Sequence, residues 1–310
     1  MAGPDLWLAA ALIIVGGGLL ALDLGAHRSG KPISIANAAA WSCVYVAAAL
    51  AFSVLVLLLK GQEAFALFLT GFTLEKMLSV DNLFVFIAIF SYFGVKDGDQ
   101  HKILHLGILG SIVLRLLFVA IGTSALWLFG PIAETAFALI ILYTVYVMAL
   151  ADEGEEVDYA QAWYVRGTKR FLPVTDETDG NRLFIHGKAT PLFICLVAIE
   201  FSDVLFAFDS VPAIIAVTKD PVLIYSAMVF AIMGLRSLYF VVSALKRYLC
   251  HLEKAIIAIL VLFAGKLFVH AWLGLKIDPV WGLAAILTML AAGVLASIVT
   301  PDREAVSSEQ

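Results

Sequence analysis

The chain has 310 residues, of which 62% are hydrophobic and 15% are charged, and its mean hydropathy is +0.97. A soluble domain carries about 25% charged residues, so this composition excludes a soluble protein and predicts an integral membrane protein. The net charge of −5 excludes a basic nucleic-acid-binding face. Three widely separated cysteines exclude a disulfide framework and a CxxC metal site.

Nine apolar runs are each long enough to cross a bilayer core of about 30 Å, which needs about 20 residues per helix. In chain order they cover residues 6–24, 38–59, 64–93, 103–124, 126–150, 189–217, 222–245, 255–273 and 280–299. The first run lacks the positive segment of a cleaved signal peptide, so we expect a permanent span. Only the Gly130-Pro131 turn divides the fourth run from the fifth. The sequence predicts an all-α, polytopic membrane protein of about nine helices.

Lysine and arginine fall mainly in alternate loops, which predicts the orientation. One side has thirteen of them: Arg28, Lys31, Lys96, Lys102, Arg166, Lys169, Arg170, Arg182, Lys188, Lys246, Arg247, Lys254 and Arg303. The other side has three, Lys60, Lys219 and Lys276. Because cytoplasmic loops are enriched in basic residues, we expect the N-terminus outside and the C-terminus in the cytoplasm.

Two of the runs carry a matching polar pattern. Residues 75–82, EKMLSVDN, and residues 203–210, DVLFAFDS, each have an acid and, six residues later, an aspartate followed by Asn or Ser. The next runs align Arg115 with Arg236, and the runs after those align without a gap. These matches predict a three-helix unit, in runs 3–5 and 6–8, whose two copies cross the membrane in opposite directions. Inverted repeats with unusual segments at matching positions indicate a transport site between them.

The repeat divides the chain into five parts. We expect an N-terminal two-helix segment at 1–62, a first three-helix repeat at 63–150, a cytoplasmic loop at 151–188, a second, inverted repeat at 189–275, and a last helix with a cytoplasmic tail at 276–310. The loop contains the acidic run 152–158, DEGEEVD. Such a run is either a solvated segment or a cytosolic metal sensor.

Charged side chains within the spans are the candidate site residues, because a charge costs several kcal/mol in a bilayer. We single out the acids Asp23, Glu75, Asp81, Glu200, Asp203 and Asp209 and the bases Lys76, Arg115, Arg236 and Lys266. Fully ionised, these ten groups sum to −2, which one divalent cation would neutralise, although a buried carboxyl can instead be protonated.

Each of these groups also has a structural interpretation. The two arginines are expected to hold carboxylates in place, since a guanidinium binds them with two parallel hydrogen bonds. Lys76 and Lys266 are either internal counter-ions or stand-ins for a cation when the site is empty. Asp23, near the cytoplasmic end of the first span, either receives the ion or is simply solvated.

The spacing of the paired acids restricts how they bind an ion. Residues six apart on a straight helix are separated by about 600° of rotation and about 9 Å along the axis. They cannot chelate one ion together. The sequence therefore predicts either a bend or unwinding near 79–82 and 210–212, where Pro212 interrupts the hydrogen-bond ladder, or two successive ion positions.

The donors in the two motifs are carboxylate, amide and hydroxyl oxygens, with Asn82 and Ser210 completing the set. Hard oxygen donors suit magnesium, calcium and manganese(II). The chain has no P-loop, which disfavours ATP-driven pumping. It also lacks a nucleophile placed beside a His base, so we do not expect an enzyme.

At these residues the sequence resembles the TerC family of bacterial membrane proteins, and within it the Alx-like branch. The stretches ALDLGAHR, EKMLSVDNLFVF, RFLPVTDETDG and DVLFAFDSVPA carry the likeness, which runs over nearly the whole chain. The resemblance implies manganese(II) export, a link to tellurite resistance, and transport that needs Glu75, Asp81, Glu200, Asp203 and Asp209. Relatives often have Glu-Thr-Thr-Asp where this chain has Glu-Phe-Ser-Asp at 200–203, which removes one hydroxyl.

These observations together predict a transporter of the bacterial inner membrane. We expect it to export manganese(II) by alternating access between the repeats, with protons as counter-ions and without a prosthetic group. The expected partners are the metal ion, protons and the lipid bilayer, and not nucleic acid. The alternative is a non-transporting membrane component of tellurite or metal-stress resistance whose acids hold a structural calcium ion.

Overall fold

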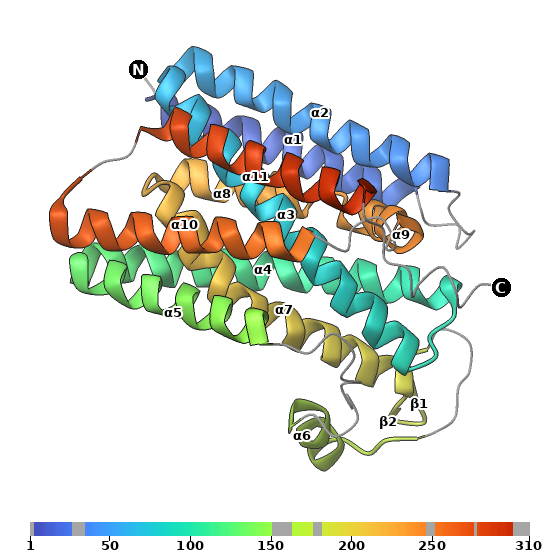
Figure 1. The fold of residues 1–310 in the computed structure, drawn as a ribbon. Helices are drawn as coiled ribbons and strands as arrows, with labels where there is room; N and C mark the ends of the chain where they lie inside the picture. The colour runs from blue at the N-terminus through green and yellow to red at the C-terminus, as the bar shows by residue number, and fades with distance from the viewer. Residues whose placement is uncertain are drawn as a thin grey trace.

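The computed structural model describes residues 3–26, 35–150, 163–175, 182–245, 252–275 and 278–299. Figure 1 shows a bundle of long helices, with α6 and the β1–β2 pair beyond one end. The bundle consists of α1 Pro4–Ala26, α2 Ile35–Lys60, α3 Gln62–Tyr92, α4 Asp97–Phe129, α5 Pro131–Leu150, α7 Pro191–Val217, α8 Pro221–Ile232, α9 Leu235–Leu245, α10 Leu252–Leu273 and α11 Pro279–Val299. We call its two ends the Lys60 end, where α2 ends, and the Lys188 end, where the β1–β2 pair lies.

Helix boundaries fall where the sequence supplies a cap or a turn. Gly130 has a φ of 50° between α4 and α5, a conformation that glycine adopts without strain. The side chain of Thr190 caps α7 by accepting a hydrogen bond from Phe193 N, and proline occupies the first position of that helix. The predicted split at Gly130-Pro131 is therefore present in the structure. The predicted boundary at 124–126 is wrong, because α4 continues to Phe129 and α5 begins only at Pro131.

By length and composition, six of the described helices can cross a membrane, or seven if the bent pair α8–α9 is one span. They are α2, α4, α5, α7, α10 and α11. Helix α3 has 31 residues but carries Glu75, Lys76 and Asp81, and the apolar part of α1 is short. The prediction of an all-α, polytopic membrane protein is confirmed, while the number nine stays a prediction.

The run predicted as one helix at 222–245 is broken, which corrects the sequence interpretation. Helix α8 ends at Ile232, α9 begins at Leu235, and the two axes differ by 54°. Gly234, between them, has a φ of 75°. A side chain at this position would also collide with the ring of Tyr45 on α2, so only glycine fits the break.

The two helices that carry the matching motifs do not unwind. Helix α3 is continuous through 79–82, and α7 is continuous from Pro191 to Val217 with Pro212 inside it. The unwinding considered for these two segments is thus wrong. Continuous helices keep the paired acids apart along each axis, and the interrupted backbone lies in the α8–α9 pair instead.

Helix pairing follows a regular scheme. Helix α3 packs against α8, α7 packs against α4, α5 packs against α10, and α3 and α7 pack against each other. The predicted repeat relates α3 to α7, α4 to α8–α9 and α5 to α10. The repeat then exchanges the α3–α8 pairing with the α7–α4 pairing. It leaves the α5–α10 and α3–α7 pairings unchanged, which is what an inverted repeat requires. The repeat and the five boundaries derived from it stay predictions.

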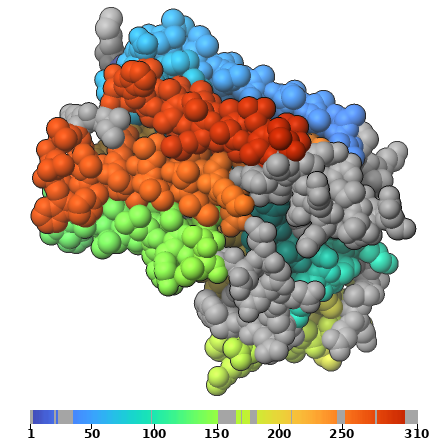
Figure 2. Space-filling view, in the orientation of Figure 1, coloured from blue at the N-terminus to red at the C-terminus, as the bar shows by residue number. Residues whose placement is uncertain are grey.

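The outer surface of the bundle is apolar. Large hydrophobic side chains are exposed on many helices, with Trp127 at 87% exposure. Figure 2 shows one face of the bundle, formed in this view by α2, α11, α10 and α5 in order. An apolar surface of this extent suits lipid and not water.

A small unit lies at the Lys188 end. It contains α6 Trp163–Phe171 and the antiparallel strands β1 Phe184–Ile185 and β2 Lys188–Ala189. It occupies the segment predicted as a cytoplasmic loop. The acidic run 152–158, considered as a metal sensor, lies outside the described residues.

Candidate functional site

A single arginine joins the two motif helices at the centre of the bundle. Arg115 on α4 donates from Nη1 to Glu75 Oε2 on α3 at 2.8 Å. It also binds Asp203 on α7, from Nη2 to Oδ1 at 3.1 Å and from Nε to Oδ2 at 3.4 Å. The exposed fractions of Arg115, Glu75 and Asp203 are 1%, 0% and 2%. These charges are removed from water, so their mutual hydrogen bonds are needed to compensate the lost hydration.

Two polar residues complete the shell around the guanidinium. Ser210 Oγ lies 3.5 Å from Arg115 Nη1. When the amide oxygen of Asn82 faces Arg115 and its nitrogen faces the Leu78 carbonyl, Asn82 accepts from Arg115 Nη2 at 3.0 Å and donates to the Leu78 carbonyl at 2.9 Å. Four of the predicted site residues therefore meet at Arg115, which was itself predicted to hold carboxylates in place.

Helix periodicity explains which motif residues reach Arg115. Asn82 follows Glu75 by seven residues and Ser210 follows Asp203 by seven, and seven residues make about two helical turns. Each pair therefore lies on one face of its helix. Asp81 precedes Asn82 by one residue, which rotates its side chain about 100° away from that face. It lies on α3 in a half-buried position.

Glu200 faces α4 one turn before Asp203. Its carboxylate lies so close to Gly110 that a Cβ added at that glycine would overlap it. Gly107, one turn earlier on α4, packs against Ile199 and, like Gly110, has no side chain on the side of α4 that faces Glu200. The absence of side chains at these two glycines lets the carboxylate approach the backbone of α4, which carries Arg115 as well.

The other predicted bases contact the ends of neighbouring helices or lie in a first turn, and two of the predicted acids have side chains outside the described residues. Lys76 donates to the carbonyls of Ala231 and Met233 at the break after α8, at 3.0 and 3.1 Å. Arg236 is buried in the first turn of α9. Lys266 on α10 donates to the Val217 carbonyl at 3.2 Å. The backbone of Asp23 is in α1 and that of Asp209 is in α7, but both side chains lie outside the described residues.

A comparison with protein families decides what kind of chain this is. The family model described as "Integral membrane protein TerC family" matches residues 60–305. The chain belongs to the TerC family. It is therefore an integral, multi-pass membrane protein, and the resemblance seen in its motifs is confirmed. The orientation of its termini stays a prediction.

Relatives of this TerC family member include proteins from bacteria and a plant. It is 45% identical over 318 residues to the Tellurium resistance protein TerC of Serratia marcescens, with 92% of each chain covered. It is 34% identical over 310 residues to the membrane protein Alx of Escherichia coli (strain K12), covering 94% of this chain and 95% of Alx. The Thylakoid membrane protein TERC of Arabidopsis thaliana is 37% identical over 257 residues, or 82% and 66% of the two chains. No solved structure matches the chain.

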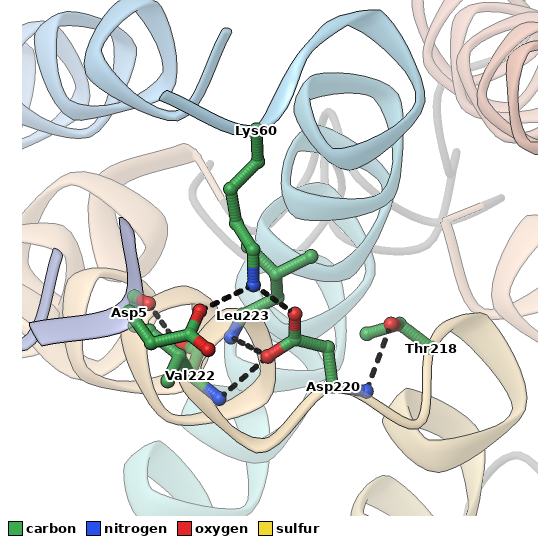
Figure 3. Close-up of polar contacts among 7 residues, drawn as sticks. Asp5, Lys60, Thr218, Asp220, Val222 and Leu223 are labelled. Carbon is green, nitrogen blue, oxygen red and sulfur yellow. Dashed lines mark hydrogen bonds and ion pairs between the residues drawn. The ribbon is translucent and has the colours of Figure 1, made fainter. Parts of the chain in front are cut away.

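At the Lys60 end, this TerC family member has a charged network that the sequence did not reveal. Lys60 binds Asp5 of α1 at 2.6 Å and also pairs with Asp220. Asp220 in turn caps α8 by accepting from Val222 N at 3.0 Å and Leu223 N at 3.4 Å (Figure 3). Lys60 and Asp220 together thus join the ends of α1, α2 and α8.

A second network lies beside the first one. Lys219, next to Asp220 in the chain, pairs with Glu134 in the first turn of α5, and Glu134 also lies 2.7 Å from His270 Nδ1 of α10. Two of the residues that connect α7 to α8 therefore each form an ion pair with another helix, Lys219 with α5 and Asp220 with α2. Glu134 was missed because it lies at the edge of an apolar run, although an acid three residues after Pro131 is a recognisable first-turn residue.

A cavity of about 800 Å³ opens at this end of the TerC protein. Lys266, Lys219 and His270 line it together with Glu63 and Asp278. Among the side chains that the structure describes, no group of three or more His, Cys, Asp or Glu is arranged to hold a metal ion. Any ion site formed by Glu75 and Asp203 therefore needs other oxygen donors or a rearrangement of Arg115.

Proposed function

We propose that this TerC family protein exports divalent cations, with manganese(II) as the main substrate, through the site at Arg115. The observation that carries the proposal is the meeting of Glu75 and Asp203 at one buried guanidinium. Acids within a membrane protein are costly and are characteristic of ion pathways. In this arrangement the guanidinium stands where a cation would bind.

The residues around Arg115 form a suitable ligand set for a hard cation. If the guanidinium withdraws, two carboxylates, the amide oxygen of Asn82 and the hydroxyl of Ser210 remain facing the same position. Oxygen donors of these kinds bind magnesium, calcium and manganese(II), and not zinc or copper(I). Arg115 then keeps the carboxylates paired when no ion is bound.

The surrounding helices support movement between two states. The site lies where α3 and α7 pack together, and each of these helices packs against the second helix of the other predicted repeat. A broken span, α8–α9, packs directly against α3. Discontinuous helices near a site between inverted repeats are typical of transporters that expose it alternately to each side.

We further propose two outer positions for the ion, one on each side of Arg115. Helix α3 runs from the Lys60 end to the Lys188 end, so Asp81 lies nearer the Lys188 end than Glu75. Helix α7 runs the other way, so Asp209 lies nearer the Lys60 end than Asp203. With the predicted orientation, Asp81 receives the ion from the cytoplasm and Asp209 releases it outside. Carboxylates that lose the metal take up protons, which couples export to a proton gradient.

Metal accumulation in cells tests this proposal. In a bacterial strain without other manganese exporters, expression of the protein should lower cellular manganese after a manganese load. Glu75→Gln and Asp203→Asn should abolish this effect at equal protein level, because each amide keeps the shape of the side chain and removes its charge. Asp278→Asn, at the rim of the Lys60 end, is the matched control and should export normally. Full export by both core variants would refute the proposal.

A second candidate is favoured by the names of the bacterial relatives. Two proteins named Tellurium resistance protein TerC, from Serratia marcescens and an Alcaligenes species, are 45% and 43% identical to this chain. In this alternative the chain is a non-transporting component of tellurite or metal-stress resistance, with calcium bound structurally by the same acids. It predicts tellurite sensitivity on deletion, calcium-dependent thermal stability and no manganese flux.

A further inference from the structure

The side chain of Lys76 ends at the break between α8 and α9. Its exposed fraction is 8%, and its Nζ donates to the carbonyl oxygens of Ala231 and Met233 at 3.0 and 3.1 Å. Both acceptors belong to the backbone that the break at Gly234 releases from the regular helical ladder. The ammonium group thus replaces hydrogen bonds that a continuous helix would make for itself.

The end of α8 is a position that favours a positive charge. The carbonyl end of a helix carries a partial negative charge, because the peptide dipoles align and the last carbonyls have no partner within the helix. Helix α8 has 12 residues, so its dipole is fully formed. In membrane transporters, the carbonyl ends of half-helices coordinate small cations.

Lys76 has no acidic partner among the residues that the structure describes. Within the described residues, its Nζ donates hydrogen bonds to the two carbonyl oxygens alone. Its neighbour Glu75 is turned about 100° around the helix and binds Arg115 instead. The charge of Lys76 is therefore compensated by main-chain dipoles, as the charge of a bound inorganic cation would be.

Two buried hydroxyls near the break strengthen this comparison. Ser79, three residues after Lys76 on the same face of α3, and Ser237, in the first turn of α9, have exposed fractions of 1% and 0%. Within the described part of the chain neither Oγ atom has a hydrogen-bond partner. Unsatisfied buried hydroxyls are uncommon. One lies on the helix that supplies Lys76 and the other in the first turn after the break, so both are candidate oxygen ligands for a cation there.

We infer that the α8–α9 break is a binding site for a small monovalent cation, and that the ammonium group of Lys76 permanently occupies it. Lys266 does not form an equivalent site, because it contacts one carbonyl, that of Val217, and lines the cavity at the Lys60 end. This inference concerns the broken helix and holds whether or not the protein moves manganese. It predicts that removing the lysine side chain creates a site for free ammonium or potassium.

Thermal unfolding of the purified full-length protein tests the inference. Melting temperatures are measured in choline chloride and in ammonium or potassium chloride of equal ionic strength, since choline is much larger than the ammonium group that occupies the break. The wild type should not respond to the exchange of salts. Lys76→Ala should melt several degrees lower in choline, and ammonium or potassium should restore part of the loss with a saturating concentration dependence.

Control variants separate a cation site from a general salt effect. Lys76→Met fills the same space without charge, so it should melt low and not respond to ammonium. Lys219→Ala, which removes a half-exposed lysine, should respond no more than the wild type. Lys76→Ser provides a second small replacement if Lys76→Ala does not fold. The inference is overturned if both small variants ignore the cations, if Lys76→Met responds equally, or if neither small variant folds even in potassium.

Discussion

Glu75 and Asp203 lie on helices that run in opposite directions, yet their carboxylates bind the same guanidinium, at 2.8 and 3.1 Å. The two acids occupy matching positions in the two motifs, and Arg115 comes from a third helix. The equivalent acids of the two sequence motifs therefore meet at one residue. It also means that an ion entering between the acids has to compete with an arginine.

Replacing the arginine should be costly for stability. Arg115→Gln leaves two buried carboxylates without their guanidinium, and breaking a buried pair typically costs about 3–5 kcal/mol. We expect a clear fall in melting temperature and in protein level. Arg236→Gln, at the matching position, should also destabilise the protein. If Arg115→Gln melted like the wild type but had lost transport, the arginine would be a moving part of the mechanism and not a clamp.

The close approach of Glu200 to α4 predicts a suppressor pair. Gly110→Ala introduces a methyl group where the Glu200 carboxylate lies, and such overpacking costs about 1–3 kcal/mol. Gly98→Ala, on the same helix with open space around it, should be tolerated and serves as the control. Adding Glu200→Ala to Gly110→Ala should restore part of the lost stability. Additive losses in the double variant, measured by thermal unfolding, would show that the two residues do not meet.

Asp220 has two structural roles that substitutions can separate. Asp220→Asn keeps a side-chain oxygen for the α8 cap and removes the charge that pairs with Lys60, so it should cost at most about 1 kcal/mol. Asp220→Ala removes the cap as well and should cost about 1–2 kcal/mol. Comparing the two melting temperatures with that of Lys60→Met isolates the ion pair. Equal losses for the Asn and Ala variants would contradict a role in capping.

The predicted orientation can be tested with single cysteines at the two ends of the bundle. In a background without the native cysteines, Lys188→Cys at the β1–β2 pair and Asp278→Cys before α11 are both exposed. A membrane-impermeant thiol reagent should label Asp278→Cys and not Lys188→Cys in intact cells. In everted membranes the pattern should reverse. Labelling of Lys188→Cys in intact cells would invert the direction of transport as well.

Much of the fold follows from the apolar runs alone, since each helix of the bundle overlaps a predicted run. The break in α8–α9 could not be predicted, because glycine is also tolerated within membrane helices and no proline marks the position. The requirement for glycine at 234 comes from a distant residue, because a side chain there would collide with the ring of Tyr45 on α2. The opposite error occurred at Pro212, which lies inside the continuous helix α7.

The candidate site was predicted as a set of residues but not as an arrangement. The matching motifs identified Glu75 and Asp203, and their i, i+7 relation to Asn82 and Ser210 would also have identified the shared face. Sequence spacing cannot show that Arg115 from another helix joins them, because this requires α4 to pack against α7 while α7 packs against α3. The networks at the Lys60 end were missed for the same reason, since their members come from five separate helices and a connecting segment.

The most direct test is manganese(II) flux into everted membrane vesicles under an imposed proton gradient, acidic inside. Vesicles with the wild-type protein should accumulate manganese, and collapse of the gradient should stop the uptake. Vesicles with equal amounts of the Glu75→Gln or Asp203→Asn protein should behave like vesicles without the protein. Gradient-driven uptake at the wild-type rate in both variants, or no uptake with the wild type, would contradict export through the carboxylates that meet at Arg115.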